Sequence, residues 1–335
     1  TMTLIAALTG VAMANAANPK HEVLDTLRSY QLQDVQVVAT RASKKTPMAF
    51  TNITQEQIKR LNTGRDIPFL LTTMPSVVTT SDAGNGMGYT GLRIRGTDAS
   101  RINVTANGIP LNDAESSQLY WVNMGDFASS LGSIQVQRGV GTSTNGAGAF
   151  GATVNMQTEN IGLQPWAAFD LAGGSYLSHK ETVRFGTGLM GGHWGIQGRL
   201  SNIGSKGYVD RASAKLNSYF LQAGYFGENT VVKFITFNGV DQKADACAPV
   251  SPPYHAWEFA SKYDQEQHGR TYNPSGKMEK DAAGNPQFYK NQNDNYHQQH
   301  YQLLWNQLLG TDWNLNLALH YTKGDGYYEQ YKKDH

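Results

Sequence analysis

The sequence lacks the features that mark several large classes of protein. Its 335 residues include one cysteine, Cys247, which excludes an intramolecular disulfide, and no Cys/His spacing resembles a zinc site. The net charge is only +1, so a nucleic-acid partner is not indicated. No run of 18 apolar residues predicts a membrane helix. No Ser/His/acid set stands out either. We therefore expect no enzyme activity, no cofactor and no bound metal.

Glycine, by contrast, is abundant, with 35 residues, and one stretch concentrates it. "SIQVQRGVGTSTNGAGAFGATVNMQT" (133–158) places two strand-like pieces around a loop of Gly, Ala, Ser and Thr. No Lys follows the glycines and the loop leads into a strand rather than a helix, so it does not fit a phosphate-binding loop. The composition instead fits a backbone that turns sharply in crowded surroundings.

The first residues predict an exported protein. An apolar stretch from Leu4 to Ala14 is followed by Ala14-Asn15-Ala16, which has the small-residue spacing of a signal-peptidase site. We expect residues 1–16 to be a signal peptide cleaved after Ala16. The sequence starts with neither Met nor a basic region, so we also expect it to begin inside a longer gene product.

Residues 17–45 form an extension that contains a β-prone segment, "DVQVVAT" (34–40). Polar and basic residues flank this segment and no turn partner lies nearby. It fits a strand that stays unpaired until another protein offers a sheet edge. It equally fits the first strand of an ordinary domain, and the residues alone leave both readings open.

Residues 46–160 have the pattern of a compact α+β domain. Thr54 and Gln57 form a capping-box pattern at the start of "TQEQIKRLN", which predicts a short helix. A second helix is predicted from Asp66 to the stop at Pro75. Short strands are predicted in "SVVTTS", "GLRIRG", "RINVTANGIPL", "SIQVQR" and "ATVNMQT", separated by Gly, Asn and Asp turns.

Residues 161–335 predict longer strands, each about the length needed to cross a bilayer as a β-strand. In the last one, Trp313, Leu317 and Tyr321 lie on one face and polar residues on the other. The seven predicted strands cover residues 163–173, 179–190, 192–204, 214–226, 228–239, 296–309 and 311–323.

The connections between these strands alternate between tight turns and long loops rich in Tyr and Asp. The long loops include residues 240–295 and the final stretch from 324 to 335. An outer-membrane barrel alternates in this way because its short turns and long loops lie on opposite sides of the membrane. A soluble all-β domain is the alternative, but it gives no reason for the alternation.

Seven antiparallel strands cannot close into a barrel of this class, which has an even number of strands. Roughly 175 residues hold them, about 25 per strand, so the 22 strands of a plugged transporter would need about 550 residues. We therefore expect the chain to be truncated at its C-terminus.

Together these parts resemble the TonB-dependent outer-membrane transporters of Gram-negative bacteria. "DVQVVATR" resembles their TonB box, "LLTTMPSV" their first plug helix and strand, and "LRIRGTDASRINVTANGIPLND" their Ile-Arg-Gly segment with its turn. The stretch 133–158 is similar to their Arg-Gly strand, small-residue loop and final plug strand. Departures at Gln135, Val140 and Ala106-Asn107 suggest a divergent, Bacteroidota-like subgroup.

The resemblance implies an α+β plug domain (46–160) followed by the first strands of a 22-stranded barrel (161–335). It implies uptake driven through TonB, with ExbB and ExbD, of a scarce nutrient such as a ferric siderophore, with cobalamin, haem or oligosaccharide as alternatives. Outer-membrane lipid would surround the barrel. The residues that would pair with TonB are Asp34, Val35, Gln36, Val37, Val38, Ala39 and Thr40.

The resemblance also implies two further sets of site residues. Arg93, Arg95 and Arg138 lie where the family has plug arginines that pair with barrel carboxylates. Candidate substrate contacts are the aromatic and His residues of the predicted outward loops, namely Tyr89, Tyr120, Trp121, Tyr254, His255 and Trp257. Two other functions, a passive porin or adhesion barrel and an outer-membrane hydrolase, leave the plug motifs unexplained.

Overall fold

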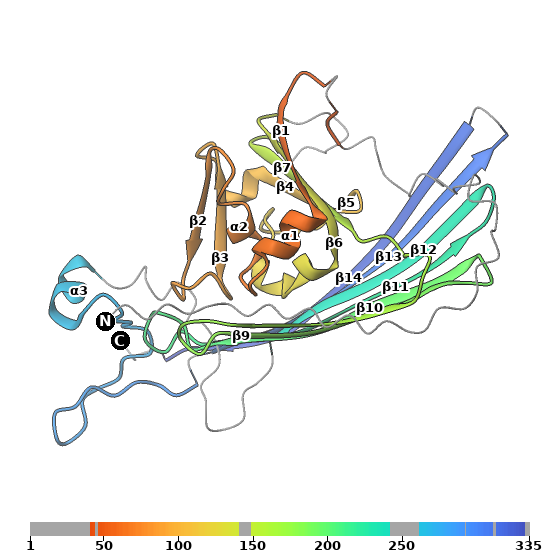
Figure 1. Cartoon of the computed structure of the whole chain (residues 1–335). Helices are drawn as coiled ribbons and strands as arrows, with labels where there is room; N and C mark the ends of the chain where they lie inside the picture. Colours follow the sequence, from red (N-terminus) through yellow and green to blue (C-terminus); the bar gives the residue numbers. More distant parts are fainter. Residues whose placement is uncertain are drawn as a thin grey trace.

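The protein has two parts, an N-terminal domain and a curved seven-stranded sheet. In the computed structural model the domain lies against the concave side of the sheet (Figure 1). The structure describes residues 41–43, 46–140, 149–241, 261–291, 293–310 and 313–331. The predicted signal peptide, the segment Asp34 to Thr40, Cys247, and Tyr254, His255 and Trp257 lie outside the described residues.

The N-terminal domain is built on a five-stranded sheet with the order β1-β6-β7-β4-β5 and a separate β2-β3 hairpin. All neighbours pair antiparallel except β4 and β7, which are parallel. The strands are β1 (Ala49–Thr54), β2 (Val77–Ser81), β3 (Thr90–Ile94), β4 (Ile102–Ala106), β5 (Ile109–Pro110), β6 (Leu131–Arg138) and β7 (Ala152–Thr158).

Short helices complete this domain. The capping box predicted at Thr54 is present, and it begins α1 (Gln55–Leu61), which buries Ile58. The second predicted helix, α2 (Ile67–Leu70), is shorter than expected. Three 3-10 helices follow, η2 (Ala99–Arg101), η3 (Trp121–Met124) and η4 (Phe127–Ser130). No helix in the described part of the chain is long and apolar enough to cross a membrane.

The five-stranded sheet has one apolar and one polar face, both buried. Ile134, Val136 and Val154 belong to the hydrophobic core on the first face. Gln135 and Gln137 alternate with them on the second face and are equally buried, as expected for side chains that point to opposite sides of a strand. The sequence patterns do not predict β1, because a six-residue edge strand takes its stability from pairing with the distant β6.

The second part is an antiparallel meander in which every strand pairs with its sequence neighbours. Its strands are β8 (Trp166–Gly173), β9 (His179–Met190), β10 (Trp194–Ser205), β11 (Ala214–Phe226), β12 (Thr230–Asp241), β13 (Asn293–Leu309) and β14 (Trp313–Glu329). All seven correspond to predicted strands. A further helix, α3 (Lys262–His268), lies in the long connection between β12 and β13.

One boundary prediction was wrong. Residues 324–329 were expected to be loop because Gly, Asp and Tyr dominate them, yet they continue β14. Their partners lie at the start of β13, where Asn293 pairs with Glu329. The cross-strand ladder therefore overrides the local turn signals at this end of the sheet.

The two faces of the seven-stranded sheet differ in polarity. The outward face exposes large apolar side chains, among them Phe169, Val183, Phe185, Leu200, Leu221, Phe234, Leu303 and Trp305. The inward face buries polar and charged ones under the N-terminal domain, among them Lys180, Thr182, Arg199, Ser201, Gln222, Gln302 and Asn306. This arrangement, apolar outside and polar inside, is typical of a barrel wall that faces lipid.

Candidate functional site

The segment from η3 to η4 (residues 121–130) brings the N-terminal domain onto the inner wall. The ring of Phe127 lies 4.6 Å from that of Phe237 and 6.3 Å from that of Phe220, measured between ring centroids. These side chains belong to one hydrophobic cluster that continues from the domain core into the wall. Apolar packing therefore anchors this segment to the wall, and it flanks a buried polar residue, Asp126.

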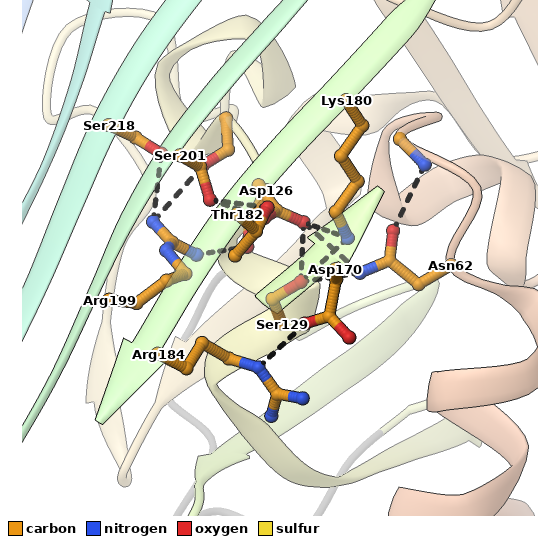
Figure 2. A network of polar contacts seen from close by, with 12 residues as sticks. Asn62, Asp126, Ser129, Asp170, Lys180, Thr182, Arg184, Arg199, Ser201 and Ser218 are labelled. Atoms are coloured by element: carbon orange, nitrogen blue, oxygen red, sulfur yellow. Dashed lines mark hydrogen bonds and ion pairs between the residues drawn. The ribbon is translucent and has the colours of Figure 1, made fainter. Parts of the chain in front are cut away.

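Asp126 is the buried polar residue at the middle of this segment. It lies between η3 and η4 in a left-handed conformation, with φ of 49°, which Asp and Asn tolerate better than most residues. Figure 2 shows its carboxylate turned toward β9 and β10. One oxygen accepts hydrogen bonds from the side chains of Asn62 and Ser129 within the domain, and the Lys180 ammonium lies 2.8 Å from the same oxygen.

The second carboxylate oxygen bonds only to the wall. It accepts hydrogen bonds from the hydroxyls of Thr182 at 2.7 Å and Ser201 at 2.5 Å. Arg199 completes the contact by donating to the main-chain carbonyls of Asp126 and Gly125, and to the Ser218 hydroxyl (Figure 2). Two strands of the wall, β9 and β10, thus bind one turn of the N-terminal domain, and Ser218 of β11 holds Arg199 in place.

Two buried carboxyl groups of this domain have opposite pKa shifts. Asp66 and Asp126 are both 7% exposed. Burial raises the pKa of Asp66, which has only the Thr90 hydroxyl to oppose it. Burial alone would also raise the pKa of Asp126, but the charges of Lys180 and Arg199 hold that pKa well below its ordinary value of 3.8. Asp126 is therefore ionised at neutral pH because the wall supplies the compensating cations.

Further polar contacts extend along the interface. The Asn107 side chain donates to the Gln302 side-chain oxygen at 3.0 Å, and Gln302 donates back to the carbonyl of Ala106. On β10, Gln197 donates to the carbonyl of Glu159 at 2.8 Å. The interface therefore combines an apolar cluster with exchangeable hydrogen bonds, so it can rearrange in water more readily than an apolar core.

A glycine of the wall allows main chain of the N-terminal domain to approach closely. A methyl group added at Gly239 of β12 would lie inside van der Waals contact with the main chain of Asn123 in η3. Main chain cannot rotate away as a flexible side chain can. We expect Gly239→Ala to lower the free energy of unfolding of the docked domain by about 1–3 kcal/mol through overpacking. Urea titration of the purified full-length protein, read by hydrogen exchange across residues 121–130, measures this.

Gly173 of β8 provides the matched control for Gly239. A methyl group added there meets no atom within 4 Å. Gly173→Ala should change the same free energy by no more than about 0.5 kcal/mol. Equal effects of the two substitutions would contradict the role of Gly239 in close approach.

The predicted arginines do not form this contact. Arg93 and Arg95 are exposed, and Arg138 donates to the Thr51 hydroxyl at 2.8 Å. Among the described residues, none of the three forms an ion pair with a carboxylate. The observed pairing has the opposite polarity, with the carboxylate on the N-terminal domain and the cations on the wall.

The structure brings two of the predicted aromatic residues together. Tyr89 and Tyr120 are half-buried and pack against the same small cluster, which includes Met87 of the N-terminal domain and Leu216 of β11. The Tyr89 hydroxyl donates to Asp294 at the start of β13. Both tyrosines are therefore placed between the domain and the wall.

Trp121 corrects the sequence-based expectation. It is only 3% exposed and belongs to the main hydrophobic cluster, so its ring packs rather than faces a ligand. Its position directly after Tyr120 starts η3, which turns the indole into the core. No group of three His, Cys, Asp or Glu residues able to hold a metal ion occurs in the described ranges.

Sequence reasoning missed Asp126, Lys180 and Arg199. Strand periodicity carries part of the signal, because the outward Val183 and Phe185 put Lys180 on the inward face of β9. The same argument places Arg199 inward on β10. Nothing in "NMGDFASS" marks Asp126 as the partner of these cations, because the contact joins residues more than fifty positions apart.

Comparisons with known proteins agree with this geometry. Residues 42–153 match the family described as TonB-dependent Receptor Plug Domain. No curated protein sequence matches the chain significantly.

Solved structures share the fold. The ferric yersiniabactin uptake receptor FyuA from Yersinia pestis is 10% identical, with a TM-score of 0.65 over 88% of this chain and 43% of that one. The ferric citrate transporter FecA, in its unliganded form, is 18% identical, with a TM-score of 0.63 over 88% and 42%. The alcaligin outer membrane receptor FauA from Bordetella pertussis is 13% identical, with a TM-score of 0.57 over 86% and 41%.

A small α+β domain docked on the polar inner face of antiparallel strands defines a plugged β-barrel protein. Residues 42–153 therefore match the plug domain of TonB-dependent receptors, and the chain as a whole shares the fold of these receptor structures. The N-terminal domain is accordingly the plug, and the seven-stranded sheet is part of the barrel wall. The chain spans about two fifths of the length of these three structures.

Proposed function

We propose that this protein takes part in TonB-dependent active transport of a scarce nutrient across the outer membrane, with a ferric siderophore or other iron complex as the leading substrate. The observation that carries the proposal is a plug held in place on the inner wall by the Asp126 contact. A docked plug closes the route that a passive porin or an adhesion barrel would leave open. Uptake then requires a supply of energy that moves the plug.

The proposed location follows from the two faces of the wall. The exposed apolar side chains on the outward face would cost free energy in water and are stabilised in hydrocarbon. The buried polar side chains of the inward face suit a lumen in which a plug is bound by hydrogen bonds. We propose an outer-membrane barrel with a periplasmic N-terminus, and no enzymatic role.

The proposed partner is TonB, acting with ExbB and ExbD. "DVQVVAT" (34–40) is the candidate binding segment, because a β-prone stretch can add to a sheet edge of a partner through main-chain hydrogen bonds. Force applied there would pass along the chain into the plug. The segment precedes β1, which is the edge strand of the plug sheet. The pulling force would therefore act first on this edge strand.

For the substrate, we propose contacts from Tyr89 and Tyr120, which share one cluster between plug and wall. Aromatic rings bind flat apolar ligand faces, and phenol hydroxyls add hydrogen bonds. Tyr254, His255 and Trp257 remain candidates from the long loop. The iron-complex proposal draws on the ferric substrates of FyuA and FecA. Cobalamin, haem and oligosaccharide remain alternatives for the same machinery.

Growth and uptake together test the function. A strain lacking this gene should lose growth on one defined iron source and regain it with the full-length gene. Uptake of that labelled iron complex should stop when a protonophore collapses the proton-motive force. Protonophore-insensitive uptake would favour a passive pore. The alternative result is that the deletion strain grows normally on every iron source and loses uptake of cobalamin, haem or oligosaccharide. That result would replace the iron complex as the proposed substrate and would support the same transport mechanism.

A further inference from the structure

Residues 41–43, the first that the structure describes, lie on the polar face of the plug sheet. Ala42 is buried there beside Gln135 of β6. No strand pairing holds this stretch, since β1 begins only at Ala49. Side chains of the sheet bind it instead, which is an unusual way to fix a main chain.

Gln135 uses its amide to bind the Ala42 residue on both sides. Its side-chain oxygen accepts the Ala42 N–H at 2.7 Å, and its nitrogen donates to the Ala42 carbonyl at 2.9 Å. The same oxygen accepts from the Gln137 amide, and the same nitrogen donates to the Asn52 side-chain oxygen. These four bonds use the full hydrogen-bonding capacity of an amide. A carboxylate could not donate, so it could not reproduce the two bonds from nitrogen.

Arg41 adds a second attachment next to the first. Its guanidinium donates to the Ser133 hydroxyl at 2.8 Å and to the Gln157 side-chain oxygen at 2.7 Å. Ser133 and Gln157 are directly opposite each other in the β6–β7 pairing. The two attachments therefore hold the chain across adjacent strands.

We propose that Gln135 is a positioning residue that clamps the main chain at Ala42 and fixes the point where the chain leaves the plug. Ala42 is two residues after Thr40, the last residue of the proposed TonB-binding segment. The role of the clamp in uptake rests on the proposed TonB-dependent transport. The contacts that form the clamp do not depend on that proposal. A pull from the N-terminal side reaches the attachments at Arg41 and Ala42 before it reaches the main-chain pairing of β1. Release of both attachments would let about 20 Å of chain before β1 extend without breaking the sheet.

A buried reporter thiol tests the clamp in the purified full-length protein. Cys247 is first replaced by Ser, and Ala42→Cys is introduced, which leaves the main-chain groups of residue 42 in place. Gln135→Met keeps the length of the side chain and removes all four hydrogen bonds. We expect maleimide to label the residue 42 thiol roughly 30-fold faster in the Gln135→Met variant, because two net hydrogen bonds to this residue are lost.

Two controls separate a clamp from general loosening of the plug. Thr105→Val, on β4 and two strands from Gln135, removes a buried hydrogen bond to Asn155 on the same polar face. It leaves the four bonds of Gln135 in place and should leave the labelling rate unchanged. A second reporter, Ala106→Cys in β4, should stay slow in both variants, because Ala106 is fully buried in the core.

Equal labelling of residue 42 in the Gln135→Met and Thr105→Val variants would overturn the proposal. So would a matching acceleration at the residue 106 reporter, since the whole sheet would then have loosened. The measurement involves neither TonB nor an energy source. If the transport proposal were wrong, the labelling result would still test the clamp. The two proposals can therefore be refuted independently.

Discussion

Asp126→Asn is expected to lower the free energy of unfolding of the docked plug by about 3–5 kcal/mol, because it leaves buried cations without their counter-charge. Lys180 and Arg199 are both almost fully buried under the plug. The amide keeps the size of the side chain and tolerates the left-handed backbone, so shape and strain stay the same. Urea titration of the full-length protein, followed by hydrogen exchange across residues 121–130, gives the change.

Asp66→Asn is the matched control for this substitution. Asp66 has the same exposure in the same domain, but no cation of the described residues forms an ion pair with it, and burial raises its pKa. An amide can still accept the Thr90 hydrogen bond, so we expect a change below about 1 kcal/mol. Comparable losses at the two positions would mean that burial, and not the charge of Asp126, holds the plug.

The Asp126 contact also predicts a pH dependence. The pKa of Asp126 is lowered in the docked plug, so its contribution is fully present above the ordinary carboxyl pKa. It is lost only as the pH falls through the lowered value. The stability difference between wild type and Asp126→Asn should therefore stay constant from about pH 5 to 8 and shrink in acid. A difference that disappears near neutral pH would contradict the ion pair.

The strands of the barrel wall could be predicted from sequence because their rule is local. Alternation of apolar and polar residues, interrupted by Gly-rich turns, located β8 to β14 with ends that mostly differ by a few residues. The exception, the end of β14, depends on its partner strand rather than on its own composition. β1 was missed for the same reason, since its pairing with β6 joins distant parts of the chain.

The site was harder to predict because it is an interface between two parts of the chain that are distant in sequence. Periodicity can place Lys180 and Arg199 on the inner face, but it cannot say what lies against them. Motif resemblance favoured Arg93, Arg95 and Arg138, whereas the described contact uses Asp126 on the plug. Tyr89 and Tyr120 were placed together by contacts with Met87 and Leu216, which no local pattern encodes.

The interface suits the movement of the plug that the proposed mechanism requires. Its apolar parts are the cluster around Phe127 and a smaller one around Met87 and Leu216, and side-chain hydrogen bonds such as that between Asn107 and Gln302 hold the interface beside them. Water can replace such bonds one at a time at a net cost of about 1 kcal/mol each. The Asp126 contact is the exception, because separating its charges in a buried site costs more. We therefore expect it to be the last plug contact to yield under load.

Val37→Pro is expected to abolish uptake while leaving substrate binding unchanged. In the proposed mechanism the segment Asp34 to Thr40 adds as a strand to TonB, and proline removes a main-chain donor from that strand. The substrate contacts proposed at Tyr89 and Tyr120 are far away in the sequence. Uptake of the labelled substrate by cells, beside equilibrium binding of the same substrate to the purified protein, separates the two effects.

Val37→Ile is the control, because it keeps the N–H group and the β-branched side chain. It should transport at close to the wild-type rate. If Val37→Pro loses binding as well, the substitution has disturbed the plug rather than the partner contact. If it retains uptake, force does not enter through this segment, and the energy coupling proposed here is wrong even though the plug, its clamp at Gln135 and its Asp126 contact would remain.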